Sequence, residues 1–165
     1  MAYPTEAVYG LGCDPLNEGA VLALQRLKQR SAKKGLILIA ANLSQLDDYI
    51  GVLPDAIRQK MLGVSGRATT WVVPANEELP HWLTGAYSSI AVRLVQHPLA
   101  KELCDLAKMP IVSTSANVSG HAALTSGYRT RLKFSSGGVY TINGRVGEAT
   151  EPSQIINALT GEQLR

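Results

Sequence analysis

Hydroxyl and carboxamide side chains follow a short apolar run in the segment 111–120, Ile-Val-Ser-Thr-Ser-Ala-Asn-Val-Ser-Gly. The apolar run is typical of a buried strand, and loops at strand ends carry much of the ligand-binding chemistry of α/β proteins. Ser113, Ser115 and Asn117 could exchange hydrogen bonds with a phosphate or a carboxylate without adding charge. The segment also fits an ordinary turn held by local side-chain bonds, and both interpretations stay open at this point.

Positive charge gathers at the end of a predicted helix over residues 17–29. Lys28 and Arg30 end this helix, and Lys33 and Lys34 follow shortly before the next apolar run. Each cation at a helix C-terminus is favourable by about 0.3–1 kcal/mol, and a solvated charged face is the usual outcome. Converging cations beside a hydroxyl-rich loop would also suit a polyphosphate or an adenylate.

A single arginine, Arg93, interrupts the otherwise apolar segment 89–95. An arginine is rarely buried without an anionic partner, so Arg93 either faces outward or points into a cleft toward a carboxylate. The segment 3–6, Tyr-Pro-Thr-Glu, predicts a strand that ends in a turn, with Thr5 and Glu6 exposed where ligands bind. A tight turn closed by a threonine hydroxyl is the alternative for this segment.

Several common signatures of cofactor and metal sites are absent from the sequence. The segment 10–15 begins like a dinucleotide loop but has proline in place of the third glycine, and no Gly-x4-Gly-Lys-Ser/Thr motif occurs. The histidines lack metal-ligand spacing to the cysteines, so no structural metal is predicted; they are His81, His97 and His121.

The composition indicates one globular domain. A chain of 165 residues with 45% hydrophobic and 18% charged residues can bury a core and is unlike a disordered tail. No apolar run approaches the roughly 20 residues of a membrane span, so no membrane association is expected. A net charge of +3 permits a nucleic-acid partner without requiring one. Two cysteines, Cys13 and Cys104, make no disulfide framework, which favours a reducing cytoplasm.

Hydrophobic periodicity predicts alternating helices and strands, and therefore an α/β fold. The apolar residues expected to face inward are Val21, Leu24 and Leu27 in the helix at 17–29, and Leu99, Leu103 and Leu106 in a helix at 98–108. Asn17 is the expected N-cap of the first helix. Further helices are predicted at 44–50, 54–62 and 125–134, and strands at 36–40, 69–73, 89–95 and 110–112, whereas 138–142 and 154–159 are ambiguous.

Taken together, these segments resemble the YrdC/Sua5 family of threonylcarbamoyl-adenylate synthases, in its short single-domain bacterial form. The matches run in order along nearly the whole chain, and their order is far more specific than any one of them. They are Tyr-Pro-Thr-Glu-Ala-Val-Tyr-Gly-Leu-Gly at 3–12, Leu-Lys-Gln-Arg at 27–30, Lys-Gly-Leu-Ile-Leu-Ile-Ala-Ala at 34–41, Trp-Leu-Thr-Gly at 82–85, Ala-Val-Arg at 91–93, His97-Pro98, the serine loop, Pro152-Ser153 and Leu-Thr-Gly-Glu at 159–162.

The resemblance implies a fold and a reaction. The fold would be a single domain over residues 1–165, with a twisted sheet of parallel and antiparallel strands, surrounding helices and a basic concave cavity. The reaction would be the synthesis of L-threonylcarbamoyl-AMP from L-threonine, bicarbonate and ATP, with release of pyrophosphate and with Mg²⁺ accompanying ATP. Partner proteins of tRNA modification would then transfer the threonylcarbamoyl group to an adenosine beside the anticodon.

The resemblance also carries functional residues over to matching positions. The family's Lys-x-Arg and Ser-x-Asn signature, with catalytic roles, falls on Lys28, Arg30, Ser115 and Asn117. Contacts to the substrate and to ATP would come from Thr5, Thr70, Arg93 and Ser113. No metal ligand is among them.

The sequence also departs from the family pattern. Family members usually carry about 20 further residues before the Tyr-Pro-Thr turn, enough for one helix of ordinary length, and we expect this segment to be missing here. The usual Trp-Pro-Gly-Pro is Ser-Gly-Arg-Ala at 65–68, and an arginine expected near Pro152 is replaced by Ala149.

Two alternatives to the synthase stay open. One is a non-catalytic module that binds tRNA or double-stranded RNA in the same concavity, and the other is a degenerate paralogue that binds a nucleotide without turnover. Surfaces for single-stranded RNA use aromatic platforms, and only 5% of the residues are aromatic, which favours a small-molecule site. Duplex RNA can be recognised by shape without such platforms.

Overall fold

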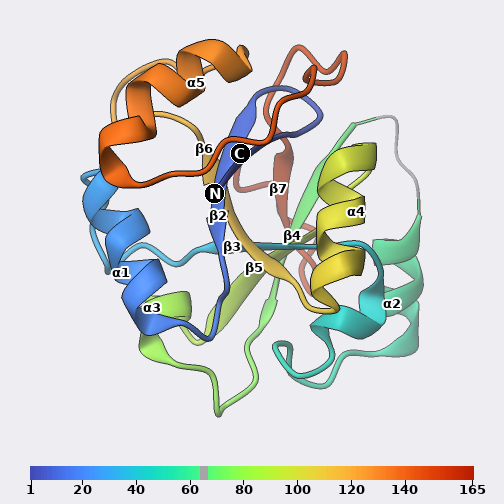
Figure 1. Cartoon of the computed structure of the whole chain (residues 1–165). Coiled ribbons are helices and arrows are strands. Elements are labelled where there is room, and N and C mark those ends of the chain that lie inside the picture. The colour runs from blue at the N-terminus through green and yellow to red at the C-terminus, as the bar shows by residue number, and fades with distance from the viewer. Residues whose placement is uncertain (64–66) are drawn as a thin grey trace.

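A single mixed sheet forms the centre of the computed structural model, which describes residues 1–63 and 67–165 (Figure 1). Seven strands of the described residues pair in the order β1-β2-β6-β3-β5-β4-β7. The β3–β5 and β4–β7 pairs are parallel and the others are antiparallel, which confirms the predicted mixed sheet. The strands are β1 (Ala2–Pro4), β2 (Tyr9–Cys13), β3 (Ile37–Ala40), β4 (Thr69–Pro74), β5 (Ser89–Leu94), β6 (Ile111–Ser115) and β7 (Gln154–Asn157).

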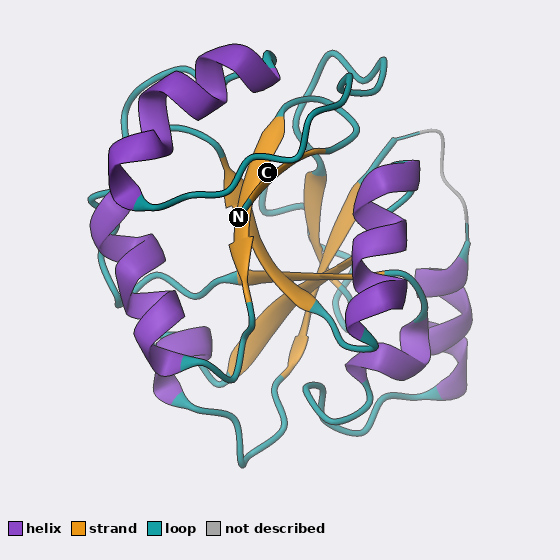
Figure 2. Ribbon diagram, in the orientation of Figure 1, coloured by secondary structure: helices purple, strands orange, loops and turns teal. Residues whose placement is uncertain are grey.

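Helices flank the sheet on two sides. Figures 1 and 2 show α1, α3 and α5 along one side of the strands and α2 and α4 along the other. Their bounds are α1 (Glu18–Leu27), α2 (Asp55–Leu62), α3 (His81–Thr84), α4 (Pro98–Ala107) and α5 (Gly127–Phe134). Among the described residues, no helix has the length and apolar character needed to cross a membrane.

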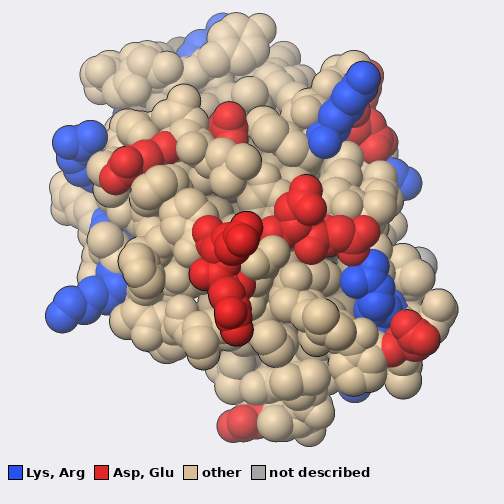
Figure 3. Space-filling view, turned by 90° about the horizontal axis from the view of Figure 1, so that it is seen from below, with Lys and Arg blue, Asp and Glu red and all other residues tan. Residues whose placement is uncertain are grey.

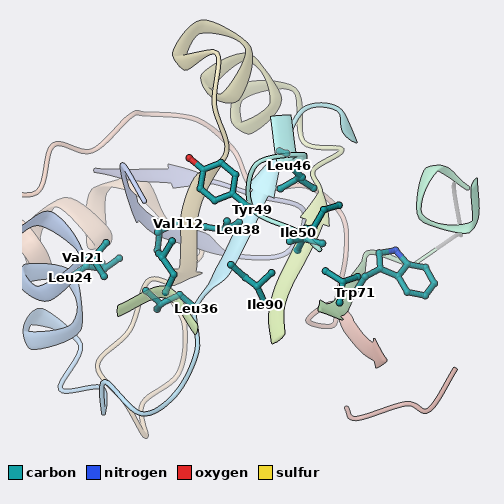
Figure 4. Close-up of a cluster of buried hydrophobic side chains, with 14 of the residues drawn as sticks. Val21, Leu24, Leu36, Leu38, Leu46, Tyr49, Ile50, Trp71, Ile90 and Val112 are labelled. Atoms are coloured by element: carbon teal, nitrogen blue, oxygen red, sulfur yellow. The ribbon is translucent and has the colours of Figure 1, made fainter. Parts of the chain in front are cut away.

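One face of the central strands carries large apolar side chains. Strand register places Leu38 opposite both Val92 and Val112, and Trp71 opposite Val92. These residues are buried and belong to the main hydrophobic cluster, part of which is drawn in Figure 4. Because fully buried Val, Leu and Ile side chains each contribute about 1.5–3 kcal/mol, this face supplies much of the driving force for folding.

The opposite face carries smaller side chains in its middle. Register places Ile37 opposite Ser113 and Ala91, and Ala91 opposite Val72. Further along β3, the same face is covered by α4 through a second, smaller apolar cluster that includes Ile39. The row of small residues stays uncovered and forms the floor of a cavity.

The helix α4 is placed as predicted but presents a different stripe to the sheet. Leu106 is 75% exposed, so its predicted inward orientation is wrong, while Leu99 and Leu103 are half-buried. The buried residues of α4 are Ala100 and Cys104, which belong to the cluster around Ile39. Small side chains at these two positions let the helix approach the sheet closely, and the Sγ of Cys104 lies 3.6 Å from the Ile39 main-chain oxygen.

The predicted helix at 44–50 is also wrong, because only the turn Leu43–Leu46 is helical, as a 3₁₀ helix. The side chain of Asn42 caps this turn by accepting a hydrogen bond from the Gln45 N–H. The chain then leaves the helical path because Ile50 is buried in the core and bridges to Ala75. Packing at this position outweighs helical periodicity.

Other predictions are confirmed or resolved. Asn17 caps α1 by accepting a hydrogen bond of 2.9 Å from the Ala20 N–H, and Val21 and Leu24 are buried as expected. Of the two ambiguous segments, 154–159 contributes β7, whereas 138–142 makes only an isolated bridge between Thr141 and Ala2. The strand β2 was not predicted, since its two glycines weaken the strand pattern.

Gly12 in β2 allows the first strands to pack closely, and we expect Gly12→Ala to lower the free energy of unfolding by about 1–3 kcal/mol. An added Cβ would clash with the Val112 main-chain oxygen and lie 2.7 Å from the Tyr3 hydroxyl. Urea denaturation would measure the change. Gly19→Ala is the control: its Cβ has ordinary room on α1, so alanine should raise stability by about 0.5–1 kcal/mol. Equal effects at the two glycines would contradict this account.

Candidate functional site

A cavity of about 1080 Å³ opens over the small side chains of the sheet. Its floor includes Ser113, Ala91 and Val72, and Gly10 of β2 lies at its edge next to Ser115. Loops from distant parts of the chain form the walls. Among the predicted site residues, the cavity is lined by Thr5, Arg30, Arg93, Ser113, Ser115 and Asn117, and it is not lined by Lys28 or Thr70.

Lys28 lies behind the serine loop and not in the cavity. It is 3% exposed and follows directly on α1 as the C-cap residue. Its Nζ donates hydrogen bonds to the main-chain oxygens of Ser115 and Asn117 and to Asn117 Oδ1, the last two at 2.8 and 3.1 Å. Ser119 completes the junction, because its N–H and its hydroxyl both donate to the Lys28 main-chain oxygen at 3.0 Å. Lys28 therefore fixes the loop from behind.

Ser115 and Asn117 are joined to each other as well as to Lys28. The Ser115 hydroxyl donates to Asn117 Oδ1 at 2.6 Å, and Asn117 Nδ2 donates to the His121 main-chain oxygen at 2.7 Å. Both side chains line the cavity together with Ser113, which is buried. The predicted turn with local side-chain bonds is thus confirmed, and these bonds hold the polar groups at the cavity wall. Ligand binding by the loop stays a prediction.

Burial lowers the pKa of both cations at this corner. Loss of hydration, with the nearby charge of Arg30, lowers the pKa of Lys28 to about 8. Burial likewise lowers the pKa of Arg30. Arg30 Nη2 donates to the Gly35 main-chain oxygen at 2.8 Å, whereas its Nε is buried without a partner among the described residues. Arg30 therefore retains donors that could hold an anion.

Arg93 points into the cleft and not outward, and Glu6 is its partner within the chain. Arg93 Nη2 lies 3.5 Å from Glu6 Oε2, and Glu6 Oε1 accepts a hydrogen bond of 2.8 Å from the Gln96 N–H. Burial by itself would raise the pKa of Glu6, but Arg93 and the N–H groups of Gln96 and His97 outweigh it, so this pKa is lowered. In the sequence, Glu6 directly follows Thr5. The signal for its role was Arg93, because an arginine within an apolar strand needs an anionic partner.

The two predicted threonines are engaged within the protein. Thr5 is buried, so its predicted exposure is wrong. Its Oγ1 donates to the Val8 main-chain oxygen at 2.7 Å, which confirms the alternative of a tight turn closed by this hydroxyl, and the residue lines the cavity. Thr70 is fully buried, with its hydroxyl 2.9 Å from the Ser153 hydroxyl. Ser153 lines the cavity in its place. Ser153 was missed as a site residue, although Pro152-Ser153 was one of the matching segments.

A segment from the second half of the chain closes one wall. The N–H groups of Gly147 and Ala149 donate to the main-chain oxygens of Thr5 and Glu6, at 2.9 and 3.0 Å. Ala149 lines the cavity at the position where an arginine was expected. Of the altered segment 65–68, residues 65 and 66 lie outside the described residues.

Comparison with known proteins assigns the chain to one protein family along its whole length. A family model for Sua5, YciO and YrdC, described as telomere recombination, matches residues 1–165. The chain therefore belongs to the Sua5/YciO/YrdC family, as its motifs predicted. A curated relative from Yersinia enterocolitica is named threonylcarbamoyl-AMP synthase; it is 48% identical over 167 residues, which cover 100% of this chain and 87% of the relative.

Solved structures show the same fold. Sua5 of P. abyssi in complex with L-threonine superimposes with a TM-score of 0.86 and 32% identity, over 94% of this chain and 46% of Sua5. The chain thus spans about half the length of that protein. YciO of E. coli matches with a TM-score of 0.78 over 94% of this chain and 76% of YciO, and at 24% identity it supports the fold alone.

The buried amine of Lys28 should titrate near pH 8, and Arg30→Gln should raise its pKa because a neighbouring positive charge is removed. NMR titration of the lysine Cε resonances would measure both values. Folding then releases a proton from Lys28 between pH 8 and 10.5, so the stability of the wild type relative to Lys28→Met should rise with pH across this window. A pKa of Lys28 at the ordinary lysine value of 10.5 would contradict the burial of its charge.

Proposed function

We propose that this protein synthesises L-threonylcarbamoyl-AMP from L-threonine, bicarbonate and ATP, and releases pyrophosphate. The name of the 48% identical relative from Yersinia enterocolitica and the L-threonine bound to Sua5 of P. abyssi support this reaction. The observation that carries the proposal is the cavity itself. It gathers Arg30, Arg93 and the Ser115–Asn117 loop, which suit the phosphates, the carboxylate and the carbamoyl group of this product.

The reaction needs positioning and charge stabilisation more than a nucleophilic side chain. The amine of threonine and bicarbonate form a carbamate with loss of water. A carbamate oxygen then attacks the α-phosphorus of ATP, and the bond to the bridging oxygen of pyrophosphate breaks. Transfers of this kind depend on alignment of the reactants and on cations placed where negative charge develops.

The phosphate end of the site would be built around Arg30 and the serine loop. The remaining donors of the Arg30 guanidinium would bind phosphate oxygens in a planar, fork-like geometry. Ser115 and Asn117 would orient the carbamoyl and phosphate groups, and Ser113 would assist from the floor. Lys28 would act through the loop, because its hydrogen bonds fix the positions of Ser115 and Asn117.

Arg93 would bind the carboxylate of threonine at the other end of the cavity. Its pairing with Glu6 is long at 3.5 Å, and its Nε has no partner among the described residues, so donors remain for a second anion. Thr5 would shape this end through the tight turn that its hydroxyl closes. Thr70 would support the cavity wall through its bond to Ser153, which lines the cavity.

Magnesium would enter as part of the Mg–ATP substrate. Within residues 1–63 and 67–165, no three or more His, Cys, Asp or Glu side chains come together to hold a metal ion. Mg²⁺ commonly keeps several waters and binds through substrate phosphates with few protein ligands. We therefore assign no step to a metal held by the protein alone.

The product would serve tRNA modification. We infer that partner proteins transfer the threonylcarbamoyl group to the adenosine beside the anticodon, which places this chain in the cytoplasm with its tRNA. A purely RNA-binding role is not favoured, because the matching relative is named as a synthase. Figure 3 also shows acidic side chains grouped at the centre of one face, which would repel a phosphate backbone there.

Pyrophosphate release that requires both threonine and bicarbonate would test the proposed reaction. We expect Arg30→Ala to lower kcat by roughly 100-fold or more, since a cation aimed at the developing charge is lost. Arg129→Ala, which removes an exposed cation from α5, is the matched control and should leave kcat unchanged. Release that is independent of threonine, or an unaffected Arg30→Ala enzyme, would overturn the proposal.

Arg93→Gln should raise the KM for threonine by roughly 10- to 100-fold, because a charge-assisted hydrogen bond is worth about 1.5–3 kcal/mol. The KM for ATP should change little, since Arg93 would contact the amino acid and not the nucleotide. Initial rates at varied concentrations of each substrate would separate the two effects. A parallel rise in both KM values would point to a general loss of structure.

A further inference from the structure

Tyr87 lies at the mouth of the cavity, on the loop between α3 and β5, and is 61% exposed. Its side chain has no hydrogen bond with any other described residue. Single exposed apolar side chains are common on protein surfaces, so exposure by itself carries no argument. The position of Tyr87 is informative, because it lines the cavity whereas the exposed tyrosines Tyr128 and Tyr140 do not.

Tyr87 continues a row of cavity residues along β5. Ser89, Ala91 and Arg93 alternate along the strand and all line the cavity, and Tyr87 is the next alternate position before the strand begins. A strand rises about 3.3 Å per residue, so the Cα atoms of Tyr87 and Arg93 are at most about 20 Å apart. The row therefore has a cation at one end and an aromatic ring at the other.

The loop that carries Tyr87 is held in place beside the phosphate-binding corner. The Ala86 N–H donates to the Lys33 main-chain oxygen at 3.1 Å. Gly85 has a φ of +65°, and a side chain there would collide with the main chain of Lys33. Arg30 is tied to the same stretch through its bond to the Gly35 oxygen. These bonds thus tie the loops of Tyr87 and Arg30 to the same stretch, residues 33–35.

The cavity offers apolar surface near this stretch. Leu36 directly follows Gly35, its N–H donates to the main-chain oxygen of Leu83 at 2.9 Å, and it lines the same cavity as Tyr87. Aromatic side chains bind nucleobases by stacking, which needs an open ring face and apolar surroundings. A ligand whose carboxylate binds Arg93 and whose phosphate binds Arg30 would extend its base toward Tyr87.

We infer that Tyr87 is the platform on which the nucleobase of ATP stacks. This inference rests on the proposed function for the identity of the nucleotide. It assigns a binding role to a residue outside the signature motifs, and it divides the cavity into an amino-acid end at Arg93, a phosphate centre at Arg30 and a base end at Tyr87.

Binding measurements without turnover test this role on the full chain. Isothermal titration would compare ATP, inorganic tripolyphosphate and L-threonine for the wild type, Tyr87→Ala, Tyr87→Phe and Tyr128→Ala. We expect Tyr87→Ala to weaken ATP binding by roughly 10-fold, as loss of one stacking contact would. Tripolyphosphate and threonine should bind it as they bind the wild type. Tyr87→Phe, which keeps the ring, and Tyr128→Ala, a remote exposed tyrosine, should bind ATP normally.

Each result decides between the alternatives. Unchanged ATP binding by Tyr87→Ala, or equal weakening for ATP and tripolyphosphate, would overturn the stacking role. Loss of ATP binding in Tyr87→Phe would do the same, because the hydroxyl and not the ring would then be responsible. If the wild type bound ATP but released no threonine-dependent pyrophosphate, the proposed reaction would fail, and the selective effect of Tyr87→Ala on ATP would still decide the stacking role.

Discussion

The two faces of the central strands differ in side-chain size, and the rest of the structure depends on this difference. On one face, Leu38 and its neighbours Val92 and Val112 fill the core. On the other, Ser113 and Ala91 are too small to fill the space above the sheet. Because protein interiors pack densely, larger residues at these positions would close the cavity or bring a helix over it. The same strands therefore supply both the stability of the fold and the space for a ligand.

The serine loop shows how a polar wall is kept in one geometry. Lys28 is buried and donates to three oxygens of residues 115–117, so the loop is fixed by charge-assisted bonds from behind. Burial of this ammonium is unfavourable by itself, as its lowered pKa indicates. The bonds to the loop satisfy the donors of the buried ammonium. A family signature residue can thus hold a cavity wall in place without lining the cavity.

Local pattern predicted much of the fold and part of the site. The capping of α1 by Asn17 and the apolar strand β3 follow from short-range chemistry, and both were predictable. The orientation of α4 was not, because the sheet accepts Ala100 and Cys104 where the leucine pattern favoured Leu106. The order of the motifs correctly indicated several of the segments that line the cavity. It could not tell that Lys28 and Thr70 face protein while Glu6, Ser153 and Tyr87 line the cavity, because such orientations depend on tertiary packing.

The junction between the first turn and the segment 147–149 has a consequence for how the site is made. Thr5 and Glu6 contribute main-chain oxygens to N–H groups more than a hundred positions later, and Gln154 of β7 pairs with Thr69 of β4, 85 positions earlier. Contacts of this kind carry a large entropy cost, because long loops must close to form them. During synthesis, the ribosome must release residues 147–157 before the cavity has all its walls. A ligand that needs all of these walls would therefore stabilise the complete fold over its partly folded precursors.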